Sequence, residues 1–85
     1  MEYVVVAFRS RSHTVRFAEY LRKNGVNAEI INTPKEAGVG CGLSVKISKS
    51  VFPVVKSAVL GMGLNSFAGF FLITLTGGKR LIRVI

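Results

Sequence analysis

The chain has 85 residues, a length that fits one small domain spanning residues 1–85. Twelve lysines and arginines against four glutamates give a net charge of +8, and a hydrophobic content of 49% argues against intrinsic disorder. A single cysteine and a single histidine exclude an internal disulfide, a two-cysteine redox pair and a multi-cysteine metal site. We therefore expect neither a bound metal nor another cofactor.

The predicted elements of the first half are a strand, a helix, a second strand and a loop: Val4–Phe8, Ser10 or Ser12 to Lys23, Ala28–Asn32 and Thr33–Gly42. The first strand is an almost continuous apolar run, as expected of a strand at the centre of a sheet. A serine can cap the helix, and Lys23 followed by Asn24 and Gly25 favours its end. The loop contains a proline and three glycines, which interrupt regular structure.

The predicted elements of the second half are a strand, a helix and two further strands: Leu43–Ser48, Ser48 or Ser50 to Gly61 or Gly63, Phe67–Leu75 and Arg80–Val84. Leu43–Ser48 alternates apolar and polar residues, which predicts a strand with one solvent-facing side. Pro53 falls in the first turn of the helix, where proline is tolerated. Gly77 and Gly78 predict a tight hairpin turn before the last strand.

This order of elements predicts an α+β fold, a ferredoxin-like split βαβ sandwich (βαββαβ) with an extra C-terminal β-strand. Both helices are expected on one face of the sheet. No segment is left over to cover the other face, so apolar side chains there would be buried by a partner or by a second copy. A homodimer is therefore one of our hypotheses.

Two apolar stretches bear on location. Met1–Phe8 is short and is followed at once by Arg9, unlike a secretory signal, so we expect a cytoplasmic protein. Ser57–Gly78 carries no charged residue over a length that could span a bilayer. Its glycines, the Asn65-Ser66 pair and a β-rich second half favour the end of a helix, a turn and a strand instead, so we expect no membrane segment.

The loop before the third strand carries the residue best suited to chemistry. Cys41 lies between Gly40 and Gly42, which have no side chains to hinder the approach of another protein's sulfur. Lys35 and Lys46 are near in sequence, and positive charge or oriented N–H groups favour the thiolate. A thiolate can attack a sulfane sulfur and hold it as a persulfide. The structural alternative is a small buried cysteine whose glycines serve only a turn or a bulge.

Thr33-Pro34-Lys35 followed by Gly40-Cys41-Gly42-Leu43 resembles the signature of a family of short bacterial proteins described as selenium/sulfur carrier-like. The stretch Arg9–Val26 is similar to the first helix of that family. The resemblance covers roughly residues 3 to 64, and Lys35 stands where arginine is the commoner residue.

The resemblance implies a small cytoplasmic thiol carrier rather than an enzyme. Cys41 would accept sulfur or selenium from a donor such as a cysteine desulfurase and pass it to an acceptor protein. In this interpretation Gly40 and Gly42 frame the thiol, and Pro34 with Lys35 anchors the loop.

The excess of cations supports a second hypothesis. Cations cluster around the first helix and the last hairpin: Arg9, Arg11, Arg16, Arg22, Lys23, Lys79, Arg80 and Arg83. Such a surface can bind RNA or an acidic protein, with Cys41 then structural. RNA is not favoured, because Phe70-Phe71 does not match the aromatic pattern of RNA-binding sheets.

A third hypothesis is an oligomer-forming or metabolite-sensing domain that uses the uncovered sheet face. His13, near the predicted helix start, is interpreted as a surface or capping residue rather than a catalytic base.

Overall fold

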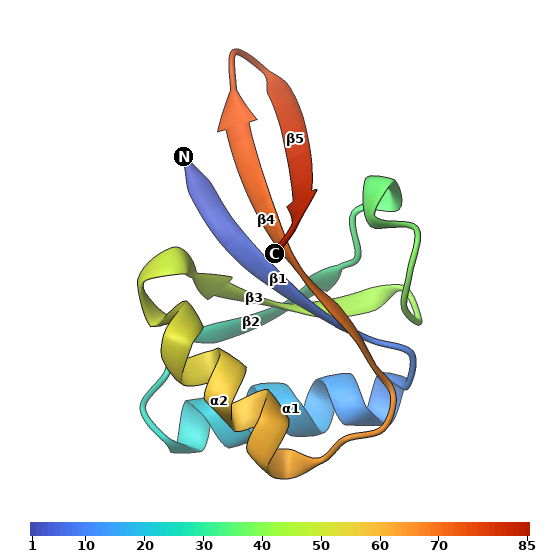
Figure 1. Ribbon diagram of the computed structural model, residues 1–85, viewed down its shortest axis with the longest axis vertical. Coiled ribbons are helices and arrows are strands. Elements are labelled where there is room, and N and C mark those ends of the chain that lie inside the picture. The colour runs from blue at the N-terminus through green and yellow to red at the C-terminus, as the bar shows by residue number, and fades with distance from the viewer.

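A computed structural model describes residues 1–85. Its elements in chain order are β1 (Glu2–Phe8), α1 (Arg11–Lys23), β2 (Ala28–Asn32), the 3₁₀ turn η1 (Lys35–Ala37), β3 (Leu43–Ser48), the 3₁₀ turn η2 (Lys49–Val51), α2 (Phe52–Met62), β4 (Phe67–Thr76) and β5 (Lys79–Val84). The sheet has the strand order β2-β3-β1-β4-β5, and every neighbouring pair is antiparallel. Both helices lie on one side of the sheet, and the β4–β5 hairpin extends away from them (Figure 1). This α+β architecture is compatible with the predicted ferredoxin-like fold.

Local chemistry places the helix boundaries close to the predicted ones. Ser10 caps α1, and its hydroxyl accepts a hydrogen bond from the backbone N–H of His13 at 3.2 Å. The helix ends at Lys23, Asn24 is its C-cap, and Gly25 follows with φ 78°. Ser48 caps η2, the short turn that leads into α2.

The main core lies between the sheet and the two helices. β1 is the central strand, and Val4–Phe8 is fully buried, as predicted. The Phe8 ring lies 5.3 Å from Phe17 of α1 and 5.9 Å from Phe67 of β4, measured between ring centroids. Burial of this aromatic cluster and of the surrounding aliphatic side chains provides most of the hydrophobic stabilisation.

The opposite face of the sheet is covered in part by the chain itself, so the prediction that nothing covers it is wrong. Its central side chains are at most 4% exposed: Val5, Ala7, Phe71 and Ile73. Ala37 and Val39 of the loop after β2, together with Ile82 of β5, pack against them. The homodimer hypothesis therefore has less apolar surface to bury at this face.

The same loop buries part of the side of β3 that was predicted to face solvent. Ser44 was predicted to face solvent, but it is fully buried, and its Oγ lies 2.6 Å from the Oγ1 of Thr33. Lys46 is half-buried, and its Nζ lies 4.6 Å from the centre of the Tyr3 ring. The alternating pattern located the strand correctly but did not show that a loop would lie over its polar face.

The uncharged stretch Ser57–Gly78 divides into the end of α2, a turn, and β4 with the hairpin turn, as predicted. Neither helix has the length and apolar character needed to cross a membrane.

Candidate functional site

The loop that carries Cys41 is closed at its base. The backbone N–H of Thr33 donates to the carbonyl oxygen of Gly42 at 2.9 Å, so the two ends of the loop meet. Pro34 is buried, and its carbonyl accepts the N–H of Ala37 at 3.0 Å at the start of η1. Gly38 then ends the turn in the left-handed region, with φ 65°. Pro34 and Lys35 thus lie at the start of the loop, next to the hydrogen bond that joins its two ends.

The backbone of Cys41 is hydrogen-bonded to the last residue of the central strand, β1. Its backbone N–H donates to the carbonyl oxygen of Phe8 at 3.2 Å. Gly40 lies so close that a Cβ at this position would be 3.2 Å from the same oxygen, and its φ is 93°. Gly42 has φ 96° but open space where its Cβ would be. The glycine at position 40 is therefore required for close approach as well as conformation, whereas at position 42 conformation alone requires it.

The Cys41 side chain is half-buried beside the first turn of α1. Its Sγ lies 3.8 Å from the Oγ1 of Thr14 and 3.7 Å from the carbonyl oxygen of Leu43. Thr14 is fully buried, and its hydroxyl donates to the carbonyl of Ser10 at 3.0 Å. No acidic residue occupies the first turn of α1, so the positive end of the helix dipole is not neutralised there.

An open groove is lined by Gly40 and Gly42, the two neighbours of Cys41, but not by Cys41 itself. Two of its lining residues, Arg9 and Lys35, are exposed cations. The full lining is Arg9, Thr33, Pro34, Lys35, Gly38, Val39, Gly40 and Gly42. We refer to it as the Arg9–Lys35 groove. Lys46, which the sequence also placed near the thiol, is not part of it, because β3 directs its Nζ toward Tyr3 at the other end of β1.

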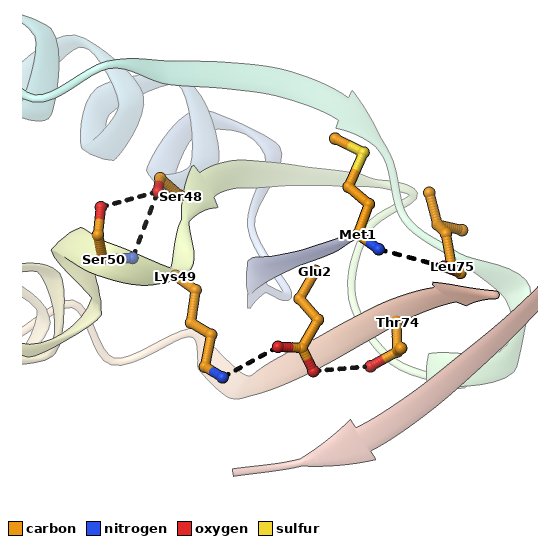
Figure 2. A network of polar contacts seen from close by, with 7 residues as sticks. All are labelled: Met1, Glu2, Ser48, Lys49, Ser50, Thr74 and Leu75. Carbon is orange, nitrogen blue, oxygen red and sulfur yellow. Dashed lines mark hydrogen bonds and ion pairs between the residues drawn. The ribbon is translucent and has the colours of Figure 1, made fainter.

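No carboxylate lines the groove. The nearest one in sequence, that of Glu36, accepts two hydrogen bonds from Arg80 of β5, at 2.8 and 3.0 Å. The hydrogen bonds from Arg80 lower the pKa of Glu36 below its ordinary value. At the far end of β1, the carboxylate of Glu2 lies between Lys49 and Thr74 (Figure 2). The groove therefore keeps an uncompensated positive charge.

Thr14 and Arg9 are site residues that the sequence analysis did not single out. Thr14 is 27 residues from Cys41 in the chain, and no local pattern links the two positions. Arg9 was counted among the cations of the first helix, but it lies just before the helix and faces the groove. Only Arg9 could have been found from the sequence, because it directly follows Val4–Phe8, the strand predicted to be central.

The remaining candidate residues lie elsewhere. His13 contributes its backbone N–H to the helix cap, and its ring Nδ1 hydrogen-bonds the hydroxyl of Ser66. Phe70 and Phe71 are 7% and 4% exposed, so neither offers a ring face for stacking on a nucleobase. No group of three or more His, Cys, Asp or Glu side chains is arranged to hold a metal ion.

Comparison with known proteins identifies the family. Residues 3–65 match the model of the family described as "Putative Se/S carrier protein-like", and the chain belongs to this family. The match includes β1 from Tyr3 onward, α1 and the complete Cys41 loop, and it ends before β4. No curated protein and no solved structure shows significant similarity to the chain.

Proposed function

We propose that the protein is a carrier that accepts sulfur or selenium on Cys41, as a persulfide or perselenide, and hands it to an acceptor protein. Membership of the selenium/sulfur carrier-like family supports a carrier role. Cys41 is the only thiol in the chain, so no other side chain can form a persulfide. The observation that carries the proposal is the position of this thiol: half-buried, framed by two glycines and beside the first turn of α1.

The transfer needs no external oxidant or reductant. The Cys41 thiolate attacks the terminal sulfur of a donor persulfide, a new S–S bond forms at Cys41, and the donor's own S–S bond breaks. The donor cysteine leaves as a thiolate, and Cys41 now carries the persulfide. Delivery repeats the same exchange with an acceptor thiolate as the attacking group. A perselenide donor follows the same steps with selenium as the transferred atom.

The contacts of the Cys41 sulfur can accommodate it as a thiol, as a thiolate and as a persulfide. Thr14 has one hydroxyl proton, which in the resting protein is donated to the carbonyl of Ser10. Rotation of this hydroxyl directs the same proton to the Cys41 sulfur when the sulfur becomes an anion. Bound persulfide adds one atom beyond Sγ, and half-burial lets that outer atom reach an acceptor. The reducing cytoplasm, our proposed location, keeps such a thiol free of disulfides.

The direct test is loading by a donor. The purified protein is incubated with a cysteine desulfurase and cysteine, and its intact mass is measured before and after treatment with dithiothreitol. We expect a gain of one sulfur atom that the reductant removes. Cys41→Ser is the matched control and should gain nothing.

Two results would contradict the proposal. One is a wild-type protein that gains no sulfur although iodoacetamide alkylates Cys41 in the native state. The other is a Cys41→Ser variant that gains as much sulfur as the wild type. A protein that cannot be loaded but binds RNA or an acidic protein equally well with and without Cys41 would favour the basic binding module instead.

A further inference from the structure

We propose that the Arg9–Lys35 groove is the docking site for an acidic segment of the protein that exchanges sulfur with Cys41. This inference rests on the proposed function, because it assigns a partner chemistry to the surface beside the carrier thiol. It concerns recognition and not the transfer step itself.

The groove carries positive charge without a compensating carboxylate. Arg9 and Lys35 both line the groove, and none of its lining residues is acidic. Glu36 follows Lys35 in the chain, but Arg80 holds its carboxylate with two hydrogen bonds. The cations of the groove therefore have no internal partner, and a carboxylate brought by another protein supplies the missing charge.

The groove also offers backbone N–H groups that have no acceptor. The N–H groups of Gly40 and Gly42 donate to no acceptor within the protein. Because neither residue has a side chain, a carboxylate or a partner backbone can approach these N–H groups closely. Both features belong to the residues directly before and after Cys41. The groove therefore adjoins the backbone on both sides of Cys41, although Cys41 itself is not among its lining residues.

The composition of the groove favours a protein over a nucleic acid. Val39 is the only large apolar side chain among the lining residues, and no aromatic ring is available for stacking. The partner must also bring a persulfide or receive one, which requires a thiol. An acidic protein segment close to a reactive cysteine meets both requirements.

The test uses two synthetic peptides as probes. Each contains one cysteine followed by four glutamates or four glutamines, and each is activated as a mixed disulfide with 2-thiopyridine. The Cys41 thiolate attacks the peptide sulfur, a disulfide forms between Cys41 and the peptide, and 2-thiopyridone leaves and is followed by its absorbance. At low ionic strength we expect the acidic peptide to react about tenfold faster than the neutral one.

Two double variants with the same net charge separate the groove from the general field of the protein. Arg9→Gln with Lys35→Gln removes both groove cations, and we expect the preference for the acidic peptide to fall to about twofold. Lys23→Gln with Lys56→Gln removes two cations from α1 and α2 that do not line the groove, and it should keep most of the preference. The preference is the ratio of the two rates within one protein, so the neutral peptide corrects for any change in thiol reactivity that the loss of Lys35 causes.

The inference is overturned if the wild type shows no preference for the acidic peptide, or if both double variants lose it equally. Its failure is distinct from failure of the proposed function. A protein that a cysteine desulfurase loads normally but that shows no acidic preference is a carrier without this docking site. A protein that prefers the acidic peptide but cannot be loaded has the docking site without the carrier role.

Discussion

The two faces of the sheet are buried by different kinds of structure. On one face, α1 and α2 cover the sheet, and the buried cluster includes Phe8, Phe17 and Leu21. On the other face, the buried cluster has only four members, and Ala37 and Val39 from the Cys41 loop pack against it, beside Ile82, the cross-strand neighbour of Ile73. The first face is a conventional helix–sheet core, whereas the second is closed by the segment that carries the candidate site.

This difference indicates how the position of Cys41 is maintained. The loop is not a free connection, because its apolar side chains form part of a core and its ends are hydrogen-bonded to each other and to β1. Disturbing the helix-covered face should lower stability without specifically freeing the thiol. Disturbing the loop-covered face should release the thiol at a smaller loss of stability.

The largest expected effect comes from a matched pair of phenylalanines, one on each face. Phe8→Ala should lower the free energy of unfolding by about 3–5 kcal/mol, because it removes a fully buried ring that contacts Phe17 and Phe67. Phe71→Ala should lower it by less, under about 3 kcal/mol, because the cover there is a loop that can settle. Urea denaturation followed by circular dichroism measures both.

The alkylation rate of Cys41 in the folded state should show the opposite order. Phe71→Ala should react faster than the wild type, because the loop loses the surface on which it rests. The free energy of unfolding of a domain of this size is about 4–13 kcal/mol, so Phe8→Ala can prevent folding altogether. In that case Phe8→Leu takes its place in the comparison. Faster alkylation in the Phe8 variant than in Phe71→Ala would show that the thiol depends on the helix-covered core instead.

The sequence was informative where local patterns determine structure. Leu43–Ser48 was located to the residue from its alternation alone, and Ser10 caps α1 as predicted. The prediction that Ser48 or Ser50 opens the second helix was wrong for α2 itself, which begins at Phe52 after Val51 and has no side-chain cap, because the turn η2 intervenes. The same pattern could not predict that Ser44 is buried, because its hydroxyl pairs with that of Thr33, 11 residues away in the chain. Likewise, Cys41 and its glycines were recognisable, but the contact with Thr14 depends on the tertiary fold.

An intermediate effect is expected from the two glycines beside Cys41. Alanine at either position should lower stability by about 1–2 kcal/mol, because both residues have positive φ. Gly40→Ala should lower it further, since its Cβ would lie 3.2 Å from the carbonyl oxygen of Phe8, whereas Gly42→Ala meets nothing within 4 Å. The same clash weakens the hydrogen bond from Cys41 to Phe8, so alkylation should accelerate in Gly40→Ala alone. Equal stability and equal alkylation rates in the two variants would remove the distinction.

The smallest expected effect concerns the ion pair that joins the loop to β5. The pKa of Glu36 is lowered by its hydrogen bonds from Arg80, so the folded state favours the carboxylate. The contribution of this pair is therefore complete above the ordinary glutamate pKa of about 4.3 and is lost as pH falls through the lower, folded-state pKa. Hydrogen exchange of the Ala37 and Gly38 amides, corrected for intrinsic rates, should show reduced protection in that acidic range.

Two charge-matched variants show whether the acid effect belongs to this pair. Glu36→Gln should reduce protection of the loop amides already at neutral pH and should leave no further loss on acidification. Glu2→Gln removes the same charge at the far end of β1, where Glu2 contacts Lys49 and Thr74 (Figure 2), and the loop should then behave as in the wild type. If Glu36→Gln matches the wild type at neutral pH, the apolar contacts of Ala37 and Val39 hold the loop without help from Arg80. The loop-covered face would then depend on packing alone, as the helix-covered face does.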